Sequence, residues 1–197
     1  MPRKIDHDQR RKEVIDVTRE LIVDGGIEAA TMREIARRAG FANGALKHFF
    51  TGKDQIIQGT YEQSLGMMTE HLDAELGQKR GFEALRAMCV ATMPTDPERI
   101  TAGRVLLSFW ERAVSNKELH DTYSKHLTAW RAALGNYIVQ GREDGDIVTN
   151  TADDELIDEI IMMNVGANIL TLLEPGVFTI KRQEANLASF FTRLREP

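Results

Sequence analysis

The 197-residue sequence predicts an all-α protein, with a short N-terminal group of three helices followed by a longer helical region. Apolar residues recur at intervals of three and four along nearly every long segment, and strict alternation is absent, which is the pattern of helices rather than strands. Glycines and prolines separate these segments where helices are expected to end. With 42% hydrophobic and 28% charged residues, the chain has the composition of a domain with a packed core.

Composition also excludes several classes of protein. The uncharged stretch 160–173 is shorter than the ~18 residues of a membrane span and contains two asparagines, so no membrane partner is expected. The basic N-terminus lacks the apolar segment of a secretory signal. The single cysteine, Cys89, cannot form an internal disulfide, which fits a protein of the reducing cytoplasm.

Charge is distributed unevenly along the chain. Residues 1–53 carry eleven Lys or Arg against eight Asp or Glu, a net charge of +3. Because the whole chain has a net charge of -5, the remainder carries -8. A small basic region joined to a larger acidic one is typical of a nucleic-acid module fused to a different function. We therefore expect a domain boundary between residues 53 and 54.

Three helices are expected within residues 10–50. The first ends at Gly25–Gly26, where a left-handed cap forms easily. The second begins at a capping box, Thr31–Glu34, in which the hydroxyl and the carboxylate each satisfy a free backbone N–H. Gly40 breaks this helix at a tight turn, and a third helix follows over residues 42–50. A turn that joins two short helices, the second with exposed polar side chains, is the helix-turn-helix arrangement of DNA-binding proteins.

The region 54–197 is predicted to contain longer helices. The helix expected at 153–173 is apolar on more than one face, so one face meets its own core and the other needs a partner. The last two helices are expected to pair with their two-fold mates in a homodimer, since their second apolar faces have no other cover. The predicted helices span about 54–75, 82–93, 98–115, 117–141, 153–173 and 181–195.

Residues 31–54 contain the pattern Thr-x-x-Glu-Ile-Ala-x-x-Ala-Gly-Phe-Ala-Asn-Gly-Ala-Leu-Lys-His-Phe-Phe-x-x-Lys-Asp. It closely resembles the N-terminal motif of the TetR family of bacterial transcriptional repressors, and the resemblance covers about residues 10–57. It implies a helix-turn-helix DNA-binding domain at 1–53 and a helical ligand-binding and dimerisation domain at 54–197. It further implies a homodimer that binds a palindromic operator in double-stranded DNA and is released by a small-molecule inducer, with no cofactor.

The side chains near the start of the third helix are of the types that contact the edges of bases in the major groove. The amide of Asn43 can donate to and accept from an adenine edge, Ala45 offers a methyl group to thymine, and Gly44 lets the backbone approach closely. The resemblance implies that Arg33 reads guanine or phosphate. It also implies phosphate contacts at Thr31 and Lys53, so the predicted DNA-binding residues are Thr31, Arg33, Ala42, Asn43, Gly44, Ala45, Lys47, His48 and Lys53.

Three positions depart from the family pattern. Lys47 stands where Tyr is usual and Phe49 where His is frequent, and both usual residues commonly bond phosphate. Lys47 replaces that contact with a charge, whereas Phe49 has no group to replace it. Ala42 stands where Ser or Thr usually caps the helix, so one cap bond is lost. A mobile basic arm is expected to follow the DNA backbone, and its residues are Arg3, Lys4, Arg10 and Arg11.

Aromatic residues in the longer region have two interpretations. They are core or interface residues of a helical bundle, or some line the inducer cavity that the family resemblance implies. Trp and Tyr rings attract amines by cation–π contact, and the Phe109–Trp110 region and the acidic body look similar to choline-responsive betaine regulators within this family, so a cationic amine is a candidate inducer class. Two asparagines on the 153–173 helix either bond a ligand or lie on the dimer seam. The candidate ligand-binding residues are Phe109, Trp110, Tyr123, Trp130, Asn164 and Asn168.

Two other functional classes are alternatives to this prediction. One is a constitutive DNA-binding regulator without an inducer, and the other is a helical ligand carrier or enzyme whose basic N-terminal region is incidental. The histidines are scattered without metal-ligand spacing, and no nucleophile elbow, phosphate loop or dinucleotide fingerprint occurs. Cys89, inside an apolar helical run, is interpreted as a small core residue. The sequence therefore predicts no catalytic residue, no metal site and no enzyme.

Overall fold

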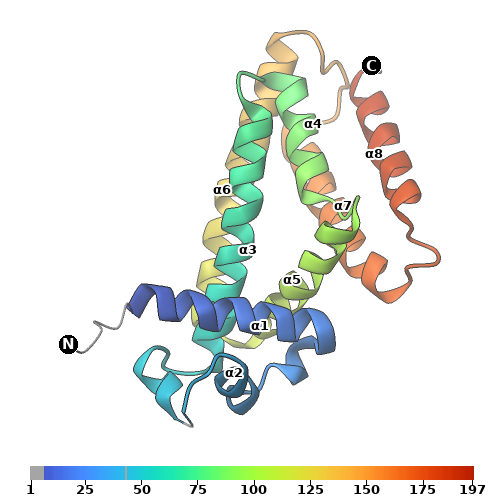
Figure 1. Cartoon of the computed structure of the whole chain (residues 1–197). Helices are drawn as coiled ribbons and strands as arrows, with labels where there is room; N and C mark the ends of the chain where they lie inside the picture. Colours follow the sequence, from blue (N-terminus) through green and yellow to red (C-terminus); the bar gives the residue numbers. More distant parts are fainter. Residues whose placement is uncertain (1–6, 43) are drawn as a thin grey trace. The chain divides into compact units, whose positions relative to one another are not determined.

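The computed structural model describes residues 7–42 and 44–197 and confirms the all-α prediction (Figure 1). Within these residues no strand is present. Asn43 and the first two basic residues of the predicted arm, Arg3 and Lys4, lie outside the described residues. The helices are α1 (His7–Ala29), α2 (Met32–Arg38), the 3₁₀ helix η1 (Ala45–His48), α3 (Lys53–Leu76), α4 (Gly81–Thr92), α5 (Pro97–Ser115), α6 (Lys117–Glu143), α7 (Asp153–Leu173) and α8 (Ile180–Leu194).

The chain packs as two compact units. The first unit comprises Met1–Gly66 and Arg104–His120, and the second comprises Met67–Gly103 and Asp121–Pro197. The first unit thus includes a segment that lies far beyond residue 53 in the sequence. The functional boundary between residues 53 and 54 stays a prediction.

The core of the first unit forms because each helix contributes one apolar face. Val14 and Ile22 of α1, Ile35 of α2 and Ile56 of α3 are all completely buried, and Val105 joins the same cluster. Burial of such a face, rather than intrinsic propensity, is what stabilises a helix as short as the seven residues of α2. α1 contacts α2, and α2 contacts η1.

The regular geometry of α1 breaks at the glycine pair where the sequence predicts the first helix to end. Gly26 has a non-helical backbone with a φ of 73°, and a short further helical stretch continues from this kink to Ala29. The predicted break is confirmed, and the sequence did not indicate the short helical stretch that follows it. Glycine adopts this left-handed conformation without the penalty that a Cβ imposes.

The third predicted helix is wrong in type and length. The segment 42–50, here called the reading segment, contains a single turn of 3₁₀ helix, η1, that begins after Gly44 at a φ of 87°. Its backbone bonds span three residues, as in the bond from Phe49 N to Leu46 O at 2.9 Å. Leu46 and Phe50 are nevertheless buried as predicted, so the apolar pattern gives the buried side correctly.

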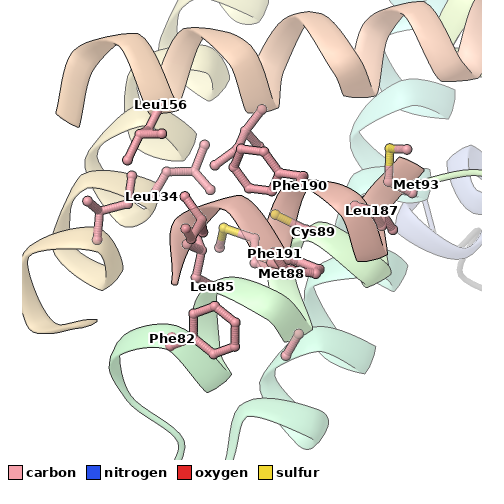
Figure 2. Packing of buried hydrophobic residues seen from close by; sticks show 14 of the residues in the cluster. Phe82, Leu85, Met88, Cys89, Met93, Leu134, Leu156, Leu187, Phe190 and Phe191 are labelled. Carbon is pink, nitrogen blue, oxygen red and sulfur yellow. The ribbon is translucent and has the colours of Figure 1, made fainter. Parts of the chain in front are cut away.

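The core of the second unit combines residues from α4, α6, α7 and α8 (Figure 2). Leu85 and Leu134 are completely buried, and the rings of Phe82 and Phe191 meet edge to face with centroids 5.7 Å apart. Cys89 lies in this core, 1% exposed, and burial raises the pKa of its thiol to about 12. The interpretation of Cys89 as a small core residue is confirmed.

α7 begins and ends where the sequence predicts. Because the helix starts well before the uncharged stretch, its best 18-residue window has a mean hydropathy of 1.5, and by length and composition α7 would pass as a membrane span. The expectation that this segment is too short to span a membrane is therefore wrong on length and composition alone. A core helix of a water-soluble protein passes the same test, and α7 contributes Leu156, Ile160 and Ala167 to the core of the second unit.

The outer faces of the last two helices differ from each other. On α7, Met162 is 67% exposed and Leu173 is 64% exposed, so the predicted uncovered apolar face is present. On α8, Leu187, Phe190, Phe191 and Leu194 are buried and Ile180 is half-buried, and no large apolar residue of this helix is exposed within the described chain. The prediction of a second apolar face on α8 is wrong. The apolar residues of this helix form a single stripe, and the core of the second unit covers that stripe.

Candidate nucleic-acid interface

The predicted DNA-binding residues that the structure describes lie on α2, on the reading segment and at the start of α3, all in the first unit. Arg33 of α2 and both Lys47 and His48 of η1 are exposed, as are Thr31, Ala42 and Gly44. Ala45 and Lys53 are half-buried. Exposed basic groups beside a short helical turn can contact phosphates and base edges of a duplex.

The arginines of α2 differ in how freely their guanidinium groups are available. Arg37 donates two hydrogen bonds to the carboxylate of Glu34, at 2.8 and 2.6 Å. Arg38 contacts Glu34 at 3.4 Å and Asp24 at 3.7 Å. Arg33 makes no ion pair with any described residue. Of these three arginines, Arg33 is therefore the one most available for an external anion.

The start of α2 forms only half of the predicted capping box. The hydroxyl of Thr31 accepts a hydrogen bond from the backbone N–H of Glu34 at 3.2 Å, as predicted. The carboxylate of Glu34 instead accepts from Arg37, and this bond holds the pKa of Glu34 at about 2. A charge-assisted bond to a guanidinium is stronger than a bond to a neutral backbone N–H, which explains the preference.

Replacement of Glu34 by Gln is expected to change the dependence of stability on pH. The folded pKa of about 2 lies below the ordinary value of 4.5, so the carboxylate stabilises the fold above about pH 4.5 and this contribution is lost as the pH falls toward 2. The difference in thermal midpoint between wild type and Glu34→Gln should therefore narrow over that range. Glu20→Gln, at an exposed α1 residue with no bond to a described residue, is the control. A constant difference for Glu34→Gln from pH 6 to 3 would contradict the ion pair.

Lys53 forms a contact that the sequence did not indicate. Its ammonium donates to the carbonyl of Ile27 at 2.9 Å, which joins the start of α3 to the last turn of α1. A cation is favourable at the C-terminal end of a helix, where carbonyl groups lack intrahelical partners. This contact gives Lys53 a role inside the fold, and its phosphate contact stays a prediction.

The prediction that Arg10 and Arg11 belong to a mobile arm is wrong. Both lie on α1, and their side chains are held by the fold. Arg10 pairs with Glu13 at 2.7 Å. Arg11 donates to the backbone carbonyl of Phe49. The regular helix begins early enough to include both residues, because its first turns pack on the aromatic end of the reading segment.

Phe49, which departs from the family pattern, packs against other rings. Its ring lies 5.2 Å from that of Phe41 in an edge-to-face arrangement and 5.0 Å from that of His7. Aromatic pairs at these separations stabilise a fold beyond the area they bury. The residue therefore has an internal function here, in place of the phosphate contact that a histidine would make.

The start of α3 is joined to α5 and α6 through one carboxylate. Asp54 accepts hydrogen bonds from Arg112 and from the side chain of Asn116, the latter at 2.8 Å. The amide oxygen of Asn116 in turn accepts from the backbone N–H of Glu118 at 3.0 Å, which caps α6. A polar cavity of about 370 Å³ lies beside this group of residues. No sequence pattern indicated this cluster.

The candidate ligand-binding aromatics occupy different surroundings. Phe109 is fully buried in the first unit and stacks on Tyr61, with centroids 3.8 Å apart, while Trp110 of the same unit is half-buried. Tyr123 and Trp130 are half-buried on α6 in the second unit. Burial raises the pKa of Tyr123. The indole nitrogen of Trp130 is buried and has no hydrogen-bond partner among the described residues.

Asn164 and Asn168 both donate into the core of the second unit. Their side-chain amides donate to the carbonyl of Thr92, at 2.6 and 3.3 Å, and Asn168 also donates to the carbonyl of Asn164 at 3.0 Å. Thr92 is the last residue of α4, so the pair satisfies a carbonyl that the helix leaves free. Asn164 is 6% exposed and Asn168 is 3% exposed. Their expected role, either in bonding a ligand or at the dimer seam, stays a prediction.

A helical unit that exposes cationic side chains on α2 and on the short turn η1 that follows it, in a chain whose other unit is also helical, has the arrangement of a helix-turn-helix transcriptional regulator. No group of three or more potential metal-ligating side chains occurs in the part of the chain that the structure describes.

Comparison with protein families identifies the particular family. Residues 14–59 match the family described as bacterial regulatory proteins, tetR family. Residues 82–196 match the family described as BetI-type transcriptional repressor, C-terminal. The chain belongs to the TetR family and has a C-terminal region of the BetI type.

Individual relatives agree with this assignment. The chain is 26% identical over 177 residues to the HTH-type transcriptional regulator PksA of Bacillus subtilis, a match that covers 89% of this chain and 84% of that protein. It is 28% identical over 114 residues to the HTH-type transcriptional regulator BetI of Pectobacterium carotovorum, covering 56% of this chain and 58% of that protein. These relatives are transcriptional regulators and not enzymes.

Solved structures show the same fold. A putative transcriptional regulator from Saccharomonospora viridis, solved in complex with choline, superposes with a TM-score of 0.85 at 19% identity and covers 94% of this chain and 96% of that chain. A transcriptional regulator from Rhodococcus superposes with a TM-score of 0.81 at 21% identity, covering 93% and 95%.

Proposed function

We propose that this protein is a homodimeric repressor that binds a palindromic DNA operator in the cytoplasm and is released by a cationic amine of the choline type. The observation that carries the proposal is the match of residues 82–196 to the BetI-type repressor family, together with a DNA-binding match at residues 14–59.

Operator binding uses the first unit. Arg33, Lys47 and His48 are exposed and provide cationic or hydrogen-bonding groups for phosphates and base edges. Asn43, outside the described residues, and Ala45 supply the proposed adenine and thymine contacts. Gly44 holds a left-handed φ of 87° and leaves its surroundings open, so the backbone can lie close to the duplex. In a dimer, two such segments read half-sites about 34–36 Å apart or slightly more.

Dimerisation uses the outer face of α7. Met162, Val165, Ile169 and Leu173 follow one another at helical spacing and are exposed or only half-buried in the single chain. An apolar face of this kind on one helix pairs with its own copy across a two-fold axis.

Induction by a cationic amine is favoured by the aromatic groups of α6. The faces of Tyr123 and Trp130 attract a quaternary ammonium, and the unpartnered indole N–H of Trp130 can donate to an oxygen of the same ligand. The Saccharomonospora viridis regulator holds choline. A ligand that prefers the conformation with weaker operator binding shifts the population by its differential affinity for the two conformations.

The test measures binding of the full-length protein to the DNA upstream of its own coding sequence, over a salt series. Choline is added in one arm and 3,3-dimethyl-1-butanol, a neutral molecule of the same shape, in another. We expect tight, salt-sensitive binding that choline releases and the neutral alcohol does not. Equal release by both compounds would overturn the cationic inducer.

Two results would favour the alternatives. Specific binding that neither choline, nor acids, nor apolar compounds release would favour a constitutive regulator. The protein could instead bind every upstream fragment only non-specifically, while choline raises its thermal midpoint. That combination would favour a ligand carrier.

A further inference from the structure

Arg11 joins the first turns of α1 to the reading segment, 38 residues further along the chain. One guanidinium nitrogen donates to the backbone carbonyl of Phe49. The same guanidinium lies over the ring of Phe50, with its central carbon 4.3 Å from the ring centroid. Arg11 is half-buried, whereas Lys12 beside it is exposed.

The reading segment needs contacts of this kind because it cannot hold its own conformation. η1 is a single turn of four residues, and isolated helices much longer than this are unstable in water. Leu46 and Phe50 anchor its inner side in the core. Its end at Phe49 leaves a carbonyl without a helical partner, and the guanidinium of Arg11 supplies a charged donor there.

Arginine is well suited to both contacts at once. Its planar guanidinium can stack on an aromatic face while its edge donates a directed hydrogen bond, and lysine has no planar group with which to do both. The rings of Phe41 and His7 also contact the ring of Phe49. Both contacts of the Arg11 guanidinium are made with the reading segment. A DNA phosphate would have to displace these contacts in order to bind Arg11.

We propose that Arg11 is a positioning residue for operator recognition: it fixes the end of the reading segment and contacts no DNA phosphate itself. This inference rests on the proposed DNA-binding function. It also reverses the expectation from sequence that Arg11 follows the DNA backbone as part of a basic arm.

Salt dependence separates the two roles. Each phosphate contact contributes about 0.9 to the slope of log affinity against log salt concentration. Removal of a phosphate contact lowers that slope and weakens binding to all sequences alike. Removal of a positioning residue lowers affinity for the operator, leaves the slope unchanged, and changes non-specific binding little.

The experiment compares wild type with Arg11→Met, which keeps the apolar stem, and with Arg33→Met as the matched control at an exposed arginine. Operator DNA and a random duplex of equal length are titrated at four salt concentrations. We expect Arg11→Met to lose about tenfold in operator affinity or more with an unchanged slope, the loss expected for one charge-assisted hydrogen bond. Arg33→Met should weaken both duplexes and flatten the slope.

A second measurement needs no DNA. Amide hydrogen exchange of residues 45–50 should become faster in Arg11→Met, with exchange in 14–22 of α1 unchanged. Arg11→Lys, which keeps the charge and one donor, should restore part of the protection and part of the operator affinity. This rescue separates a positioning effect from general unfolding, which would accelerate exchange in both segments.

The proposal is overturned by either of two results. A flatter salt slope with equal losses on both duplexes would make Arg11 a phosphate contact, and unchanged exchange at residues 45–50 would show that it does not hold the reading segment. If the wild type binds no DNA at all, the proposed function fails, while the exchange result still decides whether Arg11 fixes this segment.

Discussion

Met162→Glu is expected to convert the proposed dimer into monomers and to lower operator affinity at least about 100-fold, which corresponds to ~2.7 kcal/mol. Met162 lies on α7 with 67% of its surface exposed in the single chain, on the face that continues through Val165 and Ile169. A carboxylate placed in an apolar interface loses its hydration without gaining a partner, which costs several kcal/mol. In the proposed complex each half-site holds one protomer, so a monomer would lose the affinity that the second half-site contributes.

Light scattering measures the molar mass of each variant, and titration with operator DNA measures its affinity. Val139→Glu is the control, because Val139 is also an exposed apolar residue of the second unit, 46% exposed, but lies on α6. It should leave both mass and operator affinity unchanged. A wild-type monomer, or dissociation caused equally by both substitutions, would contradict an interface on the outer face of α7.

Gly81→Ala is expected to lower the free energy of unfolding by at least about 2 kcal/mol, because it combines backbone strain with crowding. Gly81 begins α4 with a φ of 51°, a conformation that favours glycine. A Cβ at this position would lie 3.0 Å from a carboxylate oxygen of Asp144 and 3.1 Å from the backbone nitrogen of Gly141. The backbone N–H of Gly81 also donates to the side chain of Gln140 at 3.0 Å. The start of α4 therefore lies close to the end of α6 and leaves little space for a Cβ at residue 81.

Urea denaturation followed by circular dichroism measures this loss. Gly66→Ala is the matched control, since Gly66 lies within α3, has no left-handed φ, and has open space where its Cβ would go. That substitution should stabilise the protein by up to about 1 kcal/mol, because alanine favours the helix. If Gly81→Ala proved as stable as wild type, the close approach of α4 and α6 would not be a constraint.

The positions of the long helices could be predicted because the signals that start and end them are local. α7 spans Asp153–Leu173 as predicted, and α4 ends just before the proline-containing segment that was expected to stop it. The acidic first turn of α7 interacts favourably with the N-terminal end of the helix, and proline removes a backbone donor wherever it stands. These effects depend on neighbouring residues and not on the fold.

Contacts between distant residues could not be predicted in this way. Arg11 was expected to extend along DNA, and its real partners are 38 and 39 residues away. Lys53 donates to a carbonyl 26 residues earlier, and Asn164 to one 72 residues earlier. Each partner is a backbone carbonyl or a ring whose position depends on how helices pack, and nothing in the local sequence marks it as an acceptor.

The sequence by itself determined the helical class, the long-helix boundaries, the buried side of each helix and, through residues 31–54, the family. Spacing and capping chemistry act over a few residues, so they can be read from the chain alone. Only the tertiary structure decided that the reading segment is a single 3₁₀ turn, that α8 keeps no second apolar face, and that Arg11 and Lys53 bond within the fold. A short turn and a long basic side chain both take the conformation that their surroundings stabilise, and those surroundings exist only once distant segments have packed together.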